Sequence, residues 1–157
     1  MVCALGSNVG DRRGHLAFAR RELPSRGLPW TRASSVIETD PIGGPGGQGP
    51  YLNQVLAAPA ARVAAGPAAL LSAMLELERA AGRARRERWG PRTLDIDLLF
   101  HGDRVRSEPG LTVPHPRIAE RSFVLKPLVE ILPGLVHPET GLSAAEMLAS
   151  LRRRSER

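Results

Sequence analysis

The order of strand-like and helix-like segments constrains the fold of this chain most. Val2 to Leu5 is a short apolar run typical of a strand, and the chain then turns into a helical pattern from Asp11 to about Leu23. Two further stretches, Trp30 to Thr39 and Leu52 to Ala58, are rich in residues that favour strands. The first third of the chain therefore predicts a strand, a helix and two more strands.

A helix and a fourth strand follow. Apolar residues recur at helical spacing from Pro67 until Gly82 ends the pattern, and Thr93 to His101 alternates as a strand does. The alternation predicts that one face of this strand carries Leu94, Ile96, Leu98 and Phe100, while the other carries Asp95, Asp97, Leu99 and His101. The complete order predicts an α+β, ferredoxin-like βαββαβ sandwich with an antiparallel sheet. Helical patterns around 123–131 and 143–151 predict additional C-terminal helices.

Length and composition indicate one ordinary domain over residues 1–157. No apolar run reaches the roughly 20 residues that span a bilayer, and Met1 to Leu5 leads straight into a polar turn, not into a cleavage site. The single Cys3 suits a reducing compartment. We therefore expect a cytoplasmic protein, monomeric and with no membrane partner.

The carboxylates of Asp95 and Asp97 are the strongest candidates for chemistry. Two residues apart on one strand, they lie on the same face, with Cα atoms about 6 to 7 Å apart, and can hold divalent ions together. Magnesium bound in this way keeps waters and phosphate oxygens as its other ligands. The alternative is that these carboxylates are solvated or paired with nearby arginines.

A basic segment, Gly82 to Arg92, precedes this acidic strand and holds five arginines. Cations beside a metal-binding pair of carboxylates are typical of phosphoryl transfer, because the protein must neutralise charge on the moving phosphates. His115, between two prolines, either donates a hydrogen bond to a phosphate or is a structural turn residue. The net charge of +6 leaves a second hypothesis open, a nucleic-acid-binding module with Trp89 as a stacking platform.

A resemblance to a known family rests on several motifs. Glu87 to Leu99 reads Glu-Arg-Trp-Gly-Pro-Arg-Thr-Leu-Asp-Ile-Asp-Leu-Leu, and this segment resembles the signature of 6-hydroxymethyl-7,8-dihydropterin pyrophosphokinase. The segments at 5–8 with Asp11, 38–43, 51–53, 111–116 and 120–125 are also similar to that family. The resemblance implies a transferase of folate biosynthesis that moves pyrophosphate from ATP to the hydroxymethyl-dihydropterin and releases AMP.

The resemblance also implies roles for individual residues. It places two Mg²⁺ ions on Asp95 and Asp97, and gives catalytic roles to Arg83, Arg92, Asp95 and Asp97. The implied ATP-binding residues are Glu78, Arg83, Arg85, Arg92, Leu98, Thr112, His115 and Arg121. The implied pterin-binding residues are Thr39, Pro41, Ile42, Tyr51, Asn53, Trp89, Arg92 and Phe123. The glycine-rich loop Pro41 to Pro50 is expected to close over the substrates. The partners would then be two small molecules, ATP and the pterin, and not a nucleic acid.

Overall fold

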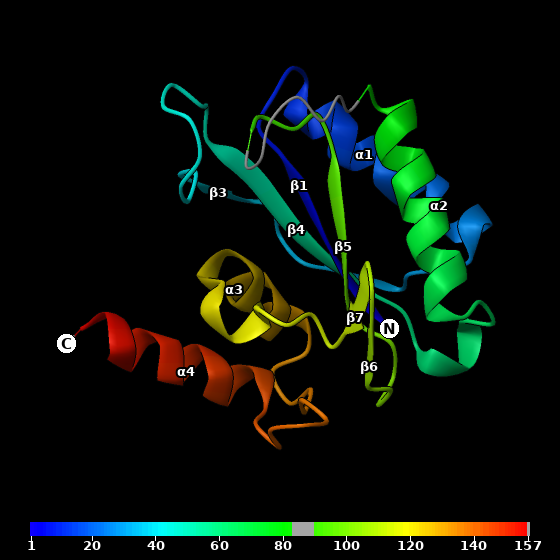
Figure 1. Ribbon diagram of the computed structural model, residues 1–157, viewed down its shortest axis with the longest axis vertical. Helices are drawn as coiled ribbons and strands as arrows, with labels where there is room; N and C mark the ends of the chain where they lie inside the picture. The colour runs from blue at the N-terminus through cyan, green and yellow to red at the C-terminus, as the bar shows by residue number, and fades with distance from the viewer. Residues whose placement is uncertain (83–89, 157) are drawn as a thin grey trace.

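The central sheet has the strand order β2-β4-β1-β5, and β3 also pairs with β4. The structure is a computed structural model that describes residues 1–82 and 90–156 (Figure 1). The strands are β1 Val2–Ser7, β2 Arg32–Ala33, β3 Ile37–Thr39, β4 Tyr51–Ala57, β5 Asp95–Phe100, β6 Arg106–Glu108 and β7 Leu111–Val113. The helices are α1 Arg12–Glu22, α2 Pro67–Ala80, α3 Ser122–Ile131 and α4 Ala144–Ser155, with short 3-10 turns at Pro24–Arg26, Ala60–Arg62 and Ile118–Glu120.

The connections between strands have the split βαβ pattern. Helix α1 leads from β1 to β2, and β4 lies between those two strands in the sheet. Helix α2 leads from β4 to β5, and β1 lies between them. Every pairing in this sheet is antiparallel. The predicted ferredoxin-like fold is confirmed, and the first strand of the chain becomes a central strand of the sheet.

The sheet is covered on both faces, which gives three layers. One buried cluster joins the sheet to α1 and α2 through side chains such as Leu16, Leu56 and Met74. A second cluster joins the opposite face to α3 and α4 through side chains such as Leu125 and Met147. Figure 1 shows α1 and α2 together on one side and the C-terminal pair, α3 and α4, on the other. The C-terminal helices therefore form the second covering layer of the sheet.

The predicted strand from Trp30 to Thr39 is interrupted. It is divided into β2 and β3, and the two serines between them make side-chain bonds in place of a regular ladder. The Oγ of Ser34 accepts a bond from the Val55 N–H at 2.9 Å, and the Ser35 Oγ donates to Glu130 on α3 at 2.7 Å. The expectation of one continuous strand was wrong, because the side chains of Ser34 and Ser35 bond to β4 and α3, and these bonds compete with regular strand pairing.

The alternation along β5 is confirmed as far as Leu99. Leu94, Ile96 and Leu98 pack in the cluster under α1 and α2, but Phe100 packs with Leu99 in the cluster under α3 and α4. The register explains the difference, because Val2 pairs with Phe100 while Cys3 pairs with Leu98. This β-bulge adds one residue to β5 and reverses the facing of the residues after it. The predicted face of Phe100 was therefore wrong.

The C-terminal half of the chain contains a hairpin and a capped helix. The hairpin of β6 and β7, which the sequence did not predict, ends in a cis peptide bond between Val113 and Pro114. Helix α4 begins with a capping box between Ser143 and Glu146 and continues to Ser155, beyond its predicted end near Leu151. No helix among the described residues is long and apolar enough to cross a membrane.

Truncation of Leu125 on α3 tests how firmly the second covering layer is held. Leu125 is fully buried in the cluster between the sheet, α3 and α4. We expect Leu125→Ala to lower the free energy of unfolding by about 2 to 5 kcal/mol, because the lost contacts leave a cavity. Urea denaturation measures this loss. Leu142→Ala, at a side chain that is 39% exposed, is the matched control and should change stability by less than about 1 kcal/mol.

Candidate active site

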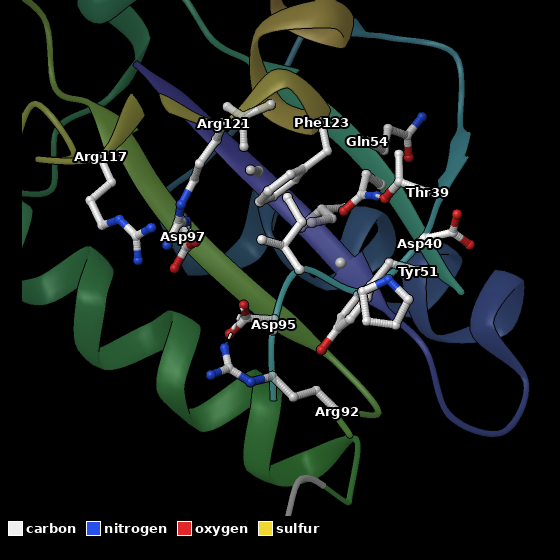
Figure 2. A pocket seen from close by; sticks show the side chains of 18 of the residues that line it. Thr39, Asp40, Tyr51, Gln54, Arg92, Asp95, Asp97, Arg117, Arg121 and Phe123 are labelled. Carbon is white, nitrogen blue, oxygen red and sulfur yellow. Dashed lines mark hydrogen bonds and ion pairs between the residues drawn. The ribbon is translucent and has the colours of Figure 1, made fainter. Parts of the chain in front are cut away.

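A cavity of about 210 Å³ opens on the face of the sheet that also carries α3. Its walls come from β1, β4, β5, the start of α3, and the loop after β3 (Figure 2). Segments that are far apart in the chain therefore meet at one site. The polar side chains in this cavity decide what it can bind.

The floor of the cavity is made by the smallest residues of β1. Gly6 pairs with Asn53 on one side and with Asp95 on the other, and Ala4 pairs with Asp97. A Cβ atom at Gly6 would lie 3.6 Å from the Asn53 Oδ1 and 4.0 Å from the Asp95 Cβ. Because β1 contributes almost no side-chain volume here, a ligand can lie directly on its backbone between the side chains of β4 and β5.

The two carboxylates of β5 both face this cavity, as the sequence predicts. Each is paired with an arginine from a different segment: the Arg92 Nη1 lies 2.7 Å from the Asp95 Oδ2, and the Arg121 Nη1 lies 2.8 Å from the Asp97 Oδ2. Figure 2 shows the two pairs side by side along β5. The arginine pairing considered as an alternative is present, and it occurs inside a cavity and not on an open surface.

The electrostatics of the site result from this crowding of charge. Burial, with the nearby Asp95 carboxylate, raises the pKa of Asp97, although His115 and Arg121 act in the opposite direction. Burial also lowers the pKa of His115, which favours the neutral imidazole. The acidic pair is therefore held close together at an electrostatic cost, which a divalent cation between the carboxylates would relieve.

The opposite wall of the cavity suits a flat polar heterocycle. Tyr51 on β4 and Phe123 on α3 supply aromatic surfaces, and the Arg121 guanidinium lies 5.7 Å from the Phe123 ring centroid. The Asn53 Nδ2 donates to the Thr39 Oγ1 at 2.7 Å, which fixes the orientation of the amide. Aromatic faces can stack on a ligand ring, and an oriented amide can form hydrogen bonds with the polar edge of that ring.

Most of the predicted site residues meet at this cavity. Those that line it are Thr39, Pro41, Ile42, Tyr51, Asn53, Arg92, Asp95, Asp97, Arg121 and Phe123. Three others, Arg83, Arg85 and Trp89, lie outside the described residues. The placement brings the proposed metal, phosphate and pterin residues together, while their individual roles stay predictions.

Four predicted ATP-binding residues lie apart from the cavity lining. Glu78 is buried on α2 and its Oε1 accepts a bond from the Ile96 N–H at 2.8 Å, so it supports the backbone of β5 from the opposite face. Leu98 is buried on that same face. Thr112 lies on β7, and half-buried His115 is close enough to Asp97 for each to shift the pKa of the other.

Several cavity residues were missed by the sequence interpretation. They are Ala4, Leu5, Gly6, Asp40, Gly43, Gln48, Gln54, Arg117, Glu120 and Val124. Period-two alternation of small residues in the first strand was the available signal for Ala4 and Gly6. The alternation of small residues indicates a cavity floor only when the strands on either side of β1 are known, because strand pairing determines which side chains lie beside a small residue.

The comparisons with known proteins assign the family. The family model of 7,8-dihydro-6-hydroxymethylpterin-pyrophosphokinase (HPPK) matches residues 2–133. The chain belongs to this family. Two relatives, each a 2-amino-4-hydroxy-6-hydroxymethyldihydropteridine pyrophosphokinase, agree: that of Synechocystis is 40% identical over 148 residues, and that of Bacillus subtilis is 44% identical over 130. These matches cover 94% and 82% of this chain, and 73% and 75% of the relatives.

A solved HPPK-DHPS structure in complex with substrates extends the likeness to the fold. It matches 99% of this chain and 43% of its own chain with a TM-score of 0.73, at only 12% sequence identity. The structural match shows the same fold, and the family model with its curated relatives identifies the chain as a pyrophosphokinase of the HPPK family. The family model ends at residue 133, so helix α4 lies beyond the matched region.

Proposed function

We propose that this HPPK-family chain transfers pyrophosphate from ATP to 6-hydroxymethyl-7,8-dihydropterin in folate biosynthesis, and that the cavity over β1 is where the transfer occurs. The proposal depends mainly on one observation: the cavity has a charged side and an aromatic side that face each other across β1. Arginine-paired carboxylates on β5 lie on one side of the floor, and aromatic and amide side chains from β4 and α3 lie on the other. One side suits a polyphosphate with its metal, and the other suits a pterin.

Asp95 and Asp97 are the residues that would hold magnesium. Their carboxylate oxygens are the hard donors that this ion prefers. No group of three or more potential ligands exists among the described residues, so phosphate oxygens and waters would complete the coordination, as is usual for Mg²⁺ in phosphoryl-transfer sites. Two ions, when bound, would neutralise charge on the phosphates. We propose that both carboxylates share this task.

Arg92 and Arg121 are proposed to hold the phosphates of ATP. Each guanidinium carries five N–H donors and uses one nitrogen on a carboxylate, so donors remain for phosphate oxygens. Burial acts to lower the pKa of Arg92, but Asp95, Tyr51 and Asp97 together raise it, so the guanidinium stays charged. Arg83 and Arg85 are expected to add further contacts to the phosphates.

The pterin is proposed to lie between Tyr51 and Phe123, above the backbone of Gly6. The bond to Thr39 occupies the Asn53 Nδ2 and directs the amide, whose Oδ1 lies on the side of Gly6, where it can accept from a ring N–H. In this position the exocyclic hydroxyl points toward β5. Thr39, Pro41 and Ile42 then close the outer edge of the pocket.

The reaction needs alignment and charge neutralisation more than covalent catalysis by the protein. The hydroxyl oxygen bonds to the β-phosphorus, the bond from that phosphorus to the α,β-bridging oxygen breaks, AMP leaves, and the hydroxyl proton passes to solvent. The residues on the two walls hold donor and acceptor in line for this displacement. No covalent enzyme intermediate is expected.

The product mixture tests the proposed function. Incubated with ATP, Mg²⁺ and the hydroxymethyl-dihydropterin, the protein should form AMP and pterin diphosphate in equal amounts, and no AMP without the pterin. Chromatography of the nucleotides measures both. Steady ADP formation would instead indicate an ordinary kinase or ATPase and would contradict the proposal.

The oligomeric state and the location of the chain stay predictions. We expect a monomeric, cytoplasmic protein, which gel filtration with light scattering and cell fractionation would check. Family membership favours small-molecule substrates over the nucleic-acid partner considered from the net charge. Salt-sensitive oligonucleotide binding without ATP turnover would reverse that preference.

A further inference from the structure

Asn8, in the turn between β1 and α1, is bonded to two other segments of the site. Its Nδ2 donates to the Gly49 carbonyl at 3.2 Å and to the Gln48 Oε1 at 3.3 Å. Its Oδ1 accepts from the Arg92 N–H at 2.8 Å, and its own N–H donates to the Arg92 carbonyl at 3.0 Å. With only 7% of its surface exposed, Asn8 joins the two segments by direct contacts from a nearly buried position.

Each of these two segments reaches a different wall of the cavity. The loop that contains Gly49 also contributes Pro41, Ile42 and Gln48 to the cavity lining, on the side proposed for the pterin. Arg92 reaches the other wall, where its guanidinium lies 2.7 Å from Asp95. A line of direct contacts therefore runs from the pterin-side loop through Asn8 and Arg92 to one of the proposed metal ligands.

We propose that Asn8 is a positioning residue that couples the pterin side of the cavity to its nucleotide and metal side. The inference rests on the proposed function. When the loop from Pro41 to Pro50 is ordered by the pterin, the Asn8 amide is fixed, and with it the backbone of Arg92. The same contacts work in reverse, because coupling between two binding sites is reciprocal.

The chemistry of the side chain explains why an amide is needed. A primary amide has two N–H donors and one carbonyl acceptor on a rigid planar group. The N–H donors of Asn8 bond to Gln48 and Gly49 in the loop, and its carbonyl oxygen accepts from the Arg92 N–H. The amide therefore cannot rotate without losing its bonds to both the loop and Arg92. An aspartate has the same shape and keeps the acceptor, but it has no donors and would place negative charge against the Gly49 carbonyl.

Binding measurements on Asn8→Asp test the coupling directly. The probes are 6-hydroxymethylpterin and an ATP analogue with a methylene in place of the α,β-bridging oxygen, which blocks the bond cleavage. Calorimetric titration gives the pterin affinity with and without the analogue and Mg²⁺. We expect the analogue to tighten pterin binding to the wild type by about tenfold or more, and to Asn8→Asp by less than about threefold. Asn8→Ala should behave in the same way.

Arg12→Ala is the matched control. The Arg12 Nη1 donates to the Pro50 carbonyl at 2.7 Å and so anchors the end of the same loop, but to α1 and not to Arg92. Its removal should weaken pterin binding equally with and without the nucleotide analogue, leaving the coupling ratio unchanged. A purely structural role for Asn8 would give that same pattern and would overturn the inference.

Three outcomes separate this inference from the proposed function. If wild type couples the two ligands and both Asn8 variants couple them equally well, the inference is wrong and the proposed function stands. If wild type binds both ligands without any coupling, the inference is also wrong. If wild type binds neither ligand, the proposed function itself fails, and the role of Asn8 fails with it.

Discussion

Replacement of Asp97 by asparagine is expected to lower turnover by about 1,000-fold or more while leaving the protein folded. An amide keeps the shape of the carboxylate but cannot supply the charge that a magnesium ligand at the reacting phosphates needs. Burial and Asp95 raise the pKa of Asp97, so the charged form is disfavoured in the folded state, and its loss should not reduce stability at pH 7. AMP formation and thermal unfolding measure the two effects.

Glu120→Gln is the control for Asp97→Asn. Glu120 lines the same cavity and is paired with Arg117 at 3.1 Å, but it is exposed and lies outside β5. Removal of this charge should change turnover by less than about threefold, because an exposed ion pair contributes little. Near-normal turnover in Asp97→Asn would remove the basis for assigning metal binding to the β5 carboxylates.

Substitution of Gly6 by leucine should weaken pterin binding by about 100-fold or more, equivalent to about 2.7 kcal/mol. Gly6 forms the floor between Asn53 and Asp95, and the position proposed for the pterin lies directly above it. A leucine side chain would occupy that space. Calorimetric titration with 6-hydroxymethylpterin checks the loss, and the inert ATP analogue should still bind.

Gly6→Ala separates a filled cavity from a disturbed strand. A single Cβ atom would meet its nearest neighbours at 3.6 to 4.0 Å, which is ordinary van der Waals contact. We therefore expect pterin affinity within about threefold of wild type for alanine. If leucine were tolerated as well as alanine, the pterin would have to bind away from the floor of β1, and the proposed orientation would be wrong.

The fold was largely predictable because its signals are local and periodic. Helical spacing identified α1 and α2, and an alternating pattern identified β5 with its carboxylates on one face. The predictions failed where a residue far away in the sequence determines the local structure. The break between β2 and β3 depends on Ser35 bonding Glu130, 95 residues further along the chain. The reversed facing of Phe100 depends on the register against β1, which no pattern within β5 records.

The candidate site was predictable in part for a related reason. Charged and aromatic residues such as Asp97 and Phe123 stand out in a sequence, and the resemblance to a family gave each a role. Residues whose contribution is the absence of a side chain, such as Gly6, do not stand out in this way. Asn8 belonged to a motif that the resemblance singled out, but its bonds to Gly49 and Arg92 became visible only in three dimensions.

The position of β1 between β4 and β5 also sets a length scale. Asn53 and Asp95 stand on strands that flank β1, so their backbones are two hydrogen-bonded spacings apart, or about 9.5 Å. That interval belongs to the peptide ladder itself and cannot drift when side chains repack. The sheet therefore fixes the separation between the two backbones, and the length of a molecule that contacts both the amide and the acids is matched to that separation.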